Sequence, residues 1–394
     1  MSSITTSNKS SSVVQSLQKY KDEDSFVYRL NLSLPNHSRE ILSEVKTGLT
    51  ANAQTVNFNV VKAGLLSQAW LKLNIDYSGG AAEAATDHAI NLINRVSLQN
   101  NNRVLEDLFP QSIRGYINKQ SAGYREKLEL LVASVQESTT TTAYDVWIPL
   151  PFSCFESPEK YLDTGFLDSL TINVQLNAFS TVMTGGTWTA ASCTLYSEYV
   201  TMDEESYAKY REMQFPAGKP VEMLWENSYQ ENDLAGSAAT SFTVNLACDH
   251  VITESHIRLL NTNAANDFFA VENIARASNV INIQLKGNGK TLYEVNPLFL
   301  SGMRKDSHAV GGTVGAKAGT LDGNIRIDWT LADVAELKDA YTGGISLKNV
   351  SGPQLVITVA ANRDANDTFQ VMHTYLQFVK IMPNSGRMEV SAAM

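Results

Sequence analysis

The string GNGKT at Gly287–Thr291 is the first candidate for chemistry, because it ends like a loop that cradles phosphate. A complete phosphate-binding loop needs a further glycine five residues before Gly289, and Gln284 occupies that position. Such a loop also opens a helix, whereas Leu292–Val295 has the composition of a strand. We therefore interpret the string as the turn of a β-hairpin.

The segment DHVITESH is the second candidate, because its side chains could ligate a metal. On a strand, His250, Glu254 and His256 share one face, and Asp249 lies beside them. Zinc and iron sites on β-barrels typically use a His-x-His pair with further ligands on another strand. No such pair occurs among the remaining histidines, which are His37, His88, His308 and His373. We therefore expect no metal site here.

Carboxylates and nucleophiles elsewhere lack the spacing of known sites. Asp203–Glu205 lies in a charged segment that we interpret as a linker. Asp364, Asn366 and Asp367 could bind calcium through oxygen atoms, but the segment lacks the glycine and glutamate of an EF-hand loop. No GxSxG elbow is present, and no cysteine has a nearby histidine. We expect no catalytic residue, no cofactor-binding residue and no metal ligand, hence no cofactor and no enzyme.

The composition excludes several further classes of protein. The 394 residues carry 31 Lys and Arg against 41 Asp and Glu, a net charge of -10, which argues against a dedicated nucleic-acid-binding protein. The sequence contains no run of about 18 apolar residues, so we expect no membrane helix. It also lacks an apolar core after the first Met, so we expect no signal peptide. Cys154, Cys193 and Cys248 lie far apart, which predicts buried thiols in a reducing compartment rather than disulfides. Charged residues are only 18% of the chain, which suits a surface that packs against copies of itself.

The elements that must carry these residues are mostly strands. From Phe26 onward the apolar residues recur with a period of two, and clusters of Gly, Asn, Asp and Ser separate the runs. The predicted strands are Thr55–Val61, Ala69–Tyr77, Arg95–Leu98, Tyr144–Leu150, Leu170–Leu176, Thr194–Met202, Phe242–Leu246, Ile257–Leu260, Val280–Leu285, Ile325–Thr330, Leu355–Val359 and Thr374–Met382. The predicted helices are few and short: Leu108–Ile117, Pro158–Asp168, Ser206–Met213 and Ala332–Tyr341. The pattern predicts an all-β protein.

The two halves of the sequence repeat the same features in the same order. INRVSLQNNNRVLED aligns with INIQLKGNGKTLYEV, so that Leu98 corresponds to Leu285. Trp147 aligns with Trp329. Next in order, residues 170–176 align with residues 355–361. The closing strands then align residues 194–202 with residues 374–382. We infer a duplicated β-domain.

The repeat predicts the division of the chain. We expect an N-terminal arm at residues 1–24, a first domain at 25–203, a linker helix at 204–214, a second domain at 215–383 and a C-terminal tail at 384–394.

The sequence resembles the double jelly-roll major capsid proteins of tailless icosahedral DNA viruses, the tectivirus–adenovirus lineage. The resemblance rests on VWIPLPFSCF (Val146–Phe155) and LDSLTINVQL (Leu167–Leu176), which are similar to strand F, a connecting helix and strand G of that family. Asn91–Asp107 is similar to its central hairpin. The resemblance covers about Phe26–Met382, and the length of the chain is similar to the compact, bacteriophage members.

This resemblance implies two tandem eight-stranded jelly-roll β-sandwiches. It further implies that three chains form a pseudo-hexameric trimer, and that trimers assemble into the icosahedral shell of a virion around the genome. The implied partners are other copies of the chain, penton and minor capsid proteins and an internal lipid membrane, with no sequence-specific nucleic acid binding. The N-terminal arm is not notably basic, which argues against a strong electrostatic hold on anionic lipid. The implied location is the virion, after synthesis in the host cytoplasm.

Two other functions fit a protein of two β-sandwiches. One is a receptor- or carbohydrate-binding protein, which a groove of exposed aromatic residues would favour. The other is a glycosidase, which needs two carboxylates facing each other across a cleft. Neither function requires two equal halves, so the duplication favours the capsid protein.

Overall fold

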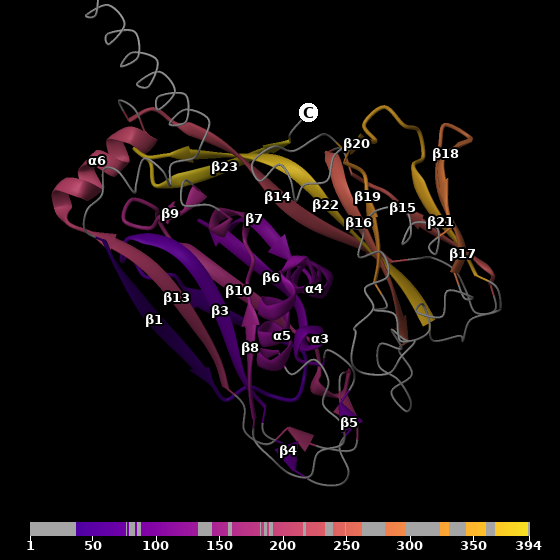
Figure 1. The fold of residues 1–394 in the computed structure, drawn as a ribbon, viewed down its shortest axis with the longest axis horizontal. Helices are drawn as coiled ribbons and strands as arrows, with labels where there is room; N and C mark the ends of the chain where they lie inside the picture. The colour runs from indigo at the N-terminus through magenta and orange to yellow at the C-terminus, as the bar shows by residue number, and fades with distance from the viewer. Residues whose placement is uncertain are drawn as a thin grey trace, which may run out of the picture.

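The computed structural model describes the greater part of the chain. The described residues are 37–75, 77–78, 83–84, 88–132, 144–156, 160–181, 183–184, 187–188, 192–215, 218–232, 239–248, 250–261, 280–296, 324–330, 344–359 and 367–392. They form mainly antiparallel sheets with a few short helices (Figure 1). Within these ranges, no helix has the length and apolar character needed to cross a bilayer.

The first half of the chain folds as two antiparallel sheets around one core. The larger sheet has the order β1-β13-β3-β8, with β9 paired to β3, and the smaller has the order β2-β10-β6-β7. The strands are β1 (His37–Thr47), β2 (Gln54–Asn59), β3 (Leu65–Ile75), β6 (Ile93–Asn100), β7 (Arg103–Leu108), β8 (Tyr144–Pro149), β9 (Leu162–Asp163), β10 (Leu170–Leu176) and β13 (Ser192–Met202). Two short ribbons join β5 (Glu83–Ala84) to β11 (Met183–Thr184) and β4 (Tyr77–Ser78) to β12 (Thr187–Trp188).

The second half repeats this topology position by position. Its larger sheet has the order β14-β22-β16-β19, with β20 on β16 and β23 on β22, and its smaller sheet has the order β15-β21-β17-β18. The strands are β14 (Val221–Asn232), β15 (Ser241–Asn245), β16 (Val251–Asn261), β17 (Val280–Gly287), β18 (Lys290–Val295), β19 (Asn324–Asp328), β20 (Ile345–Ser346), β21 (Gln354–Val359), β22 (Asp367–Met382) and β23 (Arg387–Ala392). The chain is thus an all-β protein of two tandem jelly rolls, which confirms the predicted fold class.

The strand letters expected from the sequence need a correction by one position. In chain order, the eight long strands of the first jelly roll are β1, β2, β3, β6, β7, β8, β10 and β13, which convention letters B to I. Strand β8, in the VWIPLP segment, is therefore strand G rather than F, and β10 is strand H rather than G. The hairpin β6–β7 is the predicted central hairpin.

The helices agree only in part with those predicted. Two predicted helices are present with shifted ends. The helix predicted at Leu108–Ile117 is α4 (Pro110–Lys119), and the one predicted at Ser206–Met213 is α6 (Glu204–Gln214). The helix predicted at Pro158–Asp168 is wrong, because Leu162–Asp163 pairs with β3 as β9. Helices α3 (His88–Leu92) and α5 (Ala122–Leu131) were not predicted. The helix predicted at Ala332–Tyr341 lies outside the described residues.

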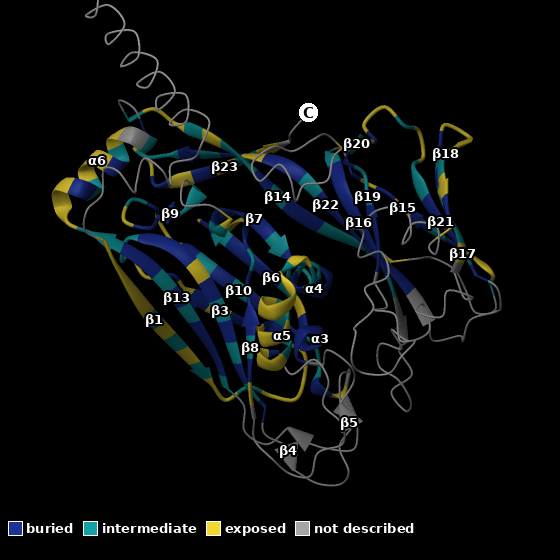
Figure 2. Cartoon of the chain, in the orientation of Figure 1, coloured by how far each residue is buried: buried dark blue, intermediate teal, exposed yellow. Residues whose placement is uncertain are grey.

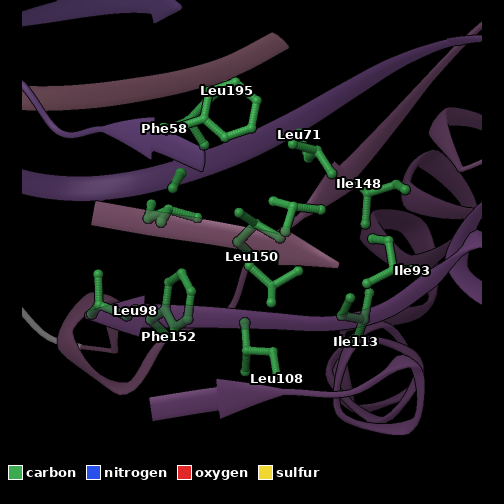
Figure 3. Packing of buried hydrophobic residues seen from close by; sticks show 14 of the residues in the cluster. Phe58, Leu71, Ile93, Leu98, Leu108, Ile113, Ile148, Leu150, Phe152 and Leu195 are labelled. Carbon is green, nitrogen blue, oxygen red and sulfur yellow. The ribbon is translucent and has the colours of Figure 1, made fainter. Parts of the chain in front are cut away.

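The apolar core of the first jelly roll is extended by strands from the second half. Phe58, Leu71 and Leu195 meet between its two sheets (Figure 3). The same cluster contains Trp225 from the start of β14 and Val379 near the end of β22. Figure 1 shows β14 and β22 running from above the first jelly roll into the second. The two jelly rolls therefore share a long two-stranded ribbon.

Burial differs sharply between the first strands of the two jelly rolls. Strand β1 forms an edge of its sheet and is largely exposed, whereas β14 is largely buried or half-buried (Figure 2).

The C-terminal segment of the chain also pairs with a sheet. Residues 387–392, in the segment expected to be a tail, pair with β22 as β23, and Asn100 accepts a hydrogen bond from the backbone N–H of Met388 at 3.0 Å.

Candidate functional site

The GNGKT string forms the turn between β17 and β18. Asn288 and Gly289 have φ angles of 54° and 72°, in the left-handed region that Asn and Gly tolerate best. Asn101 and Asn102, at the turn between β6 and β7, have φ angles of 51° and 62°. The two halves thus build the same hairpin with different residues.

A β-bulge divides the histidine segment between two faces of the sheet. Ile252 and Glu254 pair with adjacent residues of β22, so Thr253 is an extra residue that interrupts the alternation of side chains. His250 stacks on Tyr375, whose ring packs against the second core, while Glu254 and His256 line a cavity. The expectation that His250 shares a face with Glu254 and His256 is therefore wrong.

The other described residues considered for chemistry do not line this cavity. Asp203 caps helix α6 by accepting a hydrogen bond from the backbone N–H of Ser206 at 2.9 Å, and Glu204–Glu205 follow in its first turn. The three cysteines are buried thiols. Asp249, Asp364 and Asn366 lie outside the described residues. Among the residues that the structure describes, no group of three or more His, Cys, Asp or Glu side chains is placed to hold a metal ion.

The cavity has a volume of about 250 Å³ and lies where the two jelly rolls meet. Helix α4 and the segment after β8 contribute its walls on the first jelly roll, and β14, β16 and β22 contribute those on the second. Four glutamates line it: Glu106 on β7, Glu156 in the segment after β8, Glu226 on β14 and Glu254 on β16. The chemistry of the cavity depends on what these carboxylates contact.

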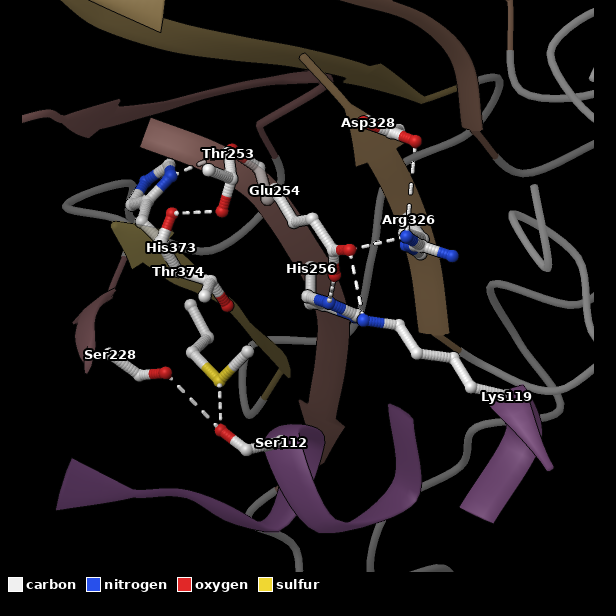
Figure 4. Close-up of polar contacts among 12 residues, drawn as sticks. Ser112, Lys119, Ser228, Thr253, Glu254, His256, Arg326, Asp328, His373 and Thr374 are labelled. Carbon is white, nitrogen blue, oxygen red and sulfur yellow. Dashed lines mark hydrogen bonds and ion pairs between the residues drawn. The ribbon is translucent and has the colours of Figure 1, made fainter. Parts of the chain in front are cut away.

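Glu254 is the centre of a buried ion cluster (Figure 4). Its carboxylate contacts Arg326 of β19, the Nζ atom of Lys119 on α4 at 3.0 Å and the Nε2 atom of His256 at 3.1 Å. Burial alone would raise the pKa of Glu254, but the neighbouring cations hold it well below its ordinary value. Burial lowers the pKa of His256. Glu254 is therefore ionised, and Lys119 links it to the other jelly roll.

Glu106 and Glu226 meet across the same boundary with the opposite electrostatic outcome. Glu106 accepts hydrogen bonds from the backbone N–H of Ser153 at 2.9 and 3.1 Å, and the Ser153 hydroxyl accepts one from the backbone N–H of Glu226 at 3.0 Å. Burial raises the pKa of Glu106 well above its ordinary value and that of Glu226 to about 7. Both carboxyl groups thus hold a proton at a higher pH than usual.

Neutral hydrogen bonds complete the interface between the jelly rolls. The side-chain amide of Gln111 on α4 donates to Gln370 at 2.8 Å, and the backbone N–H of Asp107 donates to the side chain of Asn227 at 2.7 Å. The side chain of Gln377 donates to the backbone carbonyl of Leu105. The polar side chains therefore lock the two domains together.

Sequence reasoning found only Glu254 and His256 of this interface, and for a different role. The first jelly roll contributes α4, β7 and the segment after β8, and Lys119 of α4 lies 135 residues from Glu254 along the chain. Arg326 of β19 lies 72 residues from Glu254. One available signal was the run of polar residues Glu226, Asn227 and Ser228 on β14, of which Glu226 and Ser228 face the cavity.

Comparison with protein-family models and with curated protein sequences gives no match. Comparison with solved structures gives several similar folds at low identity. A chain of the PBCV-1 virus capsid superposes with a TM-score of 0.70 and 12% identity, covering 91% of this chain and 97% of that one. The faustovirus major capsid protein has a TM-score of 0.59 and 9% identity, covering 87% and 91%. The major capsid protein of Sulfolobus turreted icosahedral virus has a TM-score of 0.55 and 10% identity, covering 88% and 97%.

Proposed function

We propose that this chain, which has the double jelly-roll fold of viral major capsid proteins, is a structural capsid protein. Three chains associate as a pseudo-hexameric trimer, and trimers assemble into an icosahedral virion shell that encloses the genome. The function is mechanical and involves no catalysis.

The observation that carries this proposal is the fixed union of two jelly rolls of identical topology. The contacts of Glu254 with Lys119 and of the Ser153 hydroxyl with the backbone of Glu226 hold the modules as one block. Three such blocks supply six similar modules, and a ring with a sixfold outline can tile a surface. The similar structures, which extend over at least 87% of this chain, support the same function.

The remaining assignments belong to the same proposal. The proposed division is an arm at residues 1–24, jelly rolls at 25–203 and 215–383, a linker helix at 204–214 and a terminal segment at 384–394. We assign the chain to the virion of a bacteriophage, with synthesis in the host cytoplasm. Penton and minor capsid proteins and an internal membrane are its further partners.

The two other functions have less support. In the described part of the chain, Glu106 accepts hydrogen bonds from Ser153 and Glu254 forms ion pairs with Arg326 and Lys119. Carboxylates engaged in this way suit a domain interface better than a glycosidase cleft. A receptor- or carbohydrate-binding role is less favoured, because the stacked rings of Trp147 and Tyr196 are half-buried and do not line the cavity.

Size-exclusion chromatography with light scattering tests the proposal, followed by electron microscopy of the same peak. We expect a stable species of three times 43.2 kDa with a hexagonal outline. A strict monomer across the concentration range would contradict the proposal. A trimer without the hexagonal outline would favour a receptor-binding protein instead.

A further inference from the structure

The interface inside the chain has two different sides, and each has a counterpart in the other jelly roll. The first jelly roll contributes its hairpin strand β7 with helix α4. The second contributes the outer face of its larger sheet, β14-β22-β16-β19. The duplication therefore supplies a second hairpin strand, β18, and a second sheet face, on β1-β13-β3-β8. Among the described residues, neither counterpart is covered in the way that its equivalent is.

The two hairpins show the difference at one residue. In β7, Leu105 is the extra residue of a β-bulge, and in β18 Leu292 occupies the same place in the same kind of bulge. Leu105 is 0% exposed beneath the second jelly roll, where its carbonyl accepts the hydrogen bond from Gln377. Leu292 is 46% exposed. A leucine that is buried in the first hairpin thus lies open in the second.

The two sheet faces show the same difference. In the aligned closing strands, Thr194 of β13 corresponds to Thr374 of β22. Thr194 pairs with Val45 on β1, and Thr374 pairs with Ser228 on β14, so Val45 and Ser228 are equivalent positions. Ser228 is 7% exposed and lies against Ser112 of α4, whereas Val45 is 56% exposed.

The uncovered face is more apolar than its buried equivalent. Ile41 lies on the same face of β1 as Val45, four residues before it, and is 65% exposed. On the neighbouring strands, Tyr196 and Trp147 stack with ring centroids 4.8 Å apart, and Trp70 pairs with Tyr196 in the register. These residues and Val45 form what we call the sheet face. Ile41 and Val45 are exposed on this face, and the three aromatic side chains are half-buried. Exposed apolar residues gathered on one side of a sheet mark a surface that binds another molecule.

We propose that the sheet face of one copy binds the hairpin edge of a second copy, where the hairpin edge is β18 with Leu292 at its bulge. The partner is another copy of this chain, because the contact that these surfaces would make is already present within the chain between their equivalents. The contact is heterologous, since its two sides differ, and a repeated heterologous contact closes into a ring or extends as a filament. This inference rests on the proposed function and assigns the surfaces that close the trimer.

Single charged substitutions on each side test the inference. Val45→Glu alters the sheet face and Leu292→Glu alters the hairpin edge, while Val61→Glu, at a 51% exposed position in the loop between β2 and β3, is the matched control. Each face variant would bury a carboxylate without a partner, so we expect the concentration needed for trimer formation to rise roughly a hundredfold. The control is expected to form trimers as the wild type does. Circular dichroism checks folding, and Val45→Ser with Leu292→Ser replace any variant that unfolds.

Mixing the two variants distinguishes this contact from other arrangements. The Val45→Glu chain keeps an intact hairpin edge and the Leu292→Glu chain keeps an intact sheet face, so an equal mixture has one functional contact. We expect light scattering to show a complex of two chains in the mixture and monomers of 43.2 kDa in each variant alone. A mixture that stays monomeric would overturn the pairing of these two surfaces.

Two further outcomes would also overturn the inference. If both variants form trimers as the wild type does, the trimer uses other surfaces, and the proposed capsid function stands without this interface. If the variants form trimers but unfold at lower temperature, the surfaces are covered within one chain. A wild-type chain that is itself monomeric would instead contradict the proposed function.

Discussion

Replacing Arg326 by methionine tests how far the ion cluster at Glu254 stabilises the folded chain. Arg326 and Glu254 lie on paired strands of the second jelly roll, and Lys119 joins the cluster to the first. The side chains of Arg326 and Glu254 are 10% and 8% exposed, so water screens their interaction little. Removing one partner of a buried ion pair costs about 3–5 kcal/mol, because the other charge stays buried. Lys119 still contacts Glu254 at 3.0 Å in the variant, so we expect the lower end, about 3 kcal/mol.

Urea unfolding followed by tryptophan fluorescence measures this loss, with all variants at one protein concentration. Lys209→Met is the matched control, since Lys209 pairs with Glu205 at 2.6 Å on the surface of α6 and exposed pairs contribute little. Arg326→Met with Glu254→Gln should be less destabilised than the sum of the two single variants, because the uncompensated charge is then absent. A midpoint for Arg326→Met equal to that of Lys209→Met would refute the role assigned to the cluster.

Three further predictions follow from the same interface. Because the pKa of Glu226 is raised to about 7 in the folded protein, the folded state keeps a proton that the unfolded chain loses near pH 4.5, so its contribution to stability falls as pH rises from 4.5 to 7. Glu226→Gln should therefore unfold at a higher urea concentration than the wild type at pH 8, with a smaller difference at pH 5; the same difference at both pH values would contradict this. Trp225→Ala should lower the free energy of unfolding by about 3–5 kcal/mol, since the fully buried ring fills the first core, and a loss below about 1 kcal/mol in urea titration would disprove that packing. Asn100→Ala should cost about 2 kcal/mol, because the backbone N–H of Met388 loses its partner, and faster amide exchange at Met388 is the specific sign to be measured by NMR.

Most of the sheet topology was predictable because its strands alternate apolar and polar residues. Strand β10, with every second residue buried, shows this pattern along its whole length. The first strand of each jelly roll was missed for two different reasons. Strand β1 exposes Ile41 and Val45, so its apolar residues do not mark a core face, and β14 has polar residues on both faces because both are packed against protein.

The contacts of the candidate site were less predictable because they depend on geometry between distant segments. The bulge at Thr253 moves His250 to the face opposite Glu254, and nothing in the local sequence marks that extra residue. The partnership of Lys119 with Glu254 joins residues 135 positions apart. The two hairpin turns, in contrast, were predictable from the sequence, because Asn and Gly tolerate the positive φ angles that such turns require.

The ribbon of β14 and β22 would limit how the proposed shell can bend. Its strands pair over Val221–Asn232 and contribute to both cores, so the two jelly rolls cannot hinge against each other without breaking paired strands. A flat facet and a curved edge place different demands on neighbouring building blocks. Because the β14–β22 ribbon keeps each chain rigid, a change in the angle between neighbouring building blocks must occur at the contacts between chains. Those contacts can differ from one neighbour to the next.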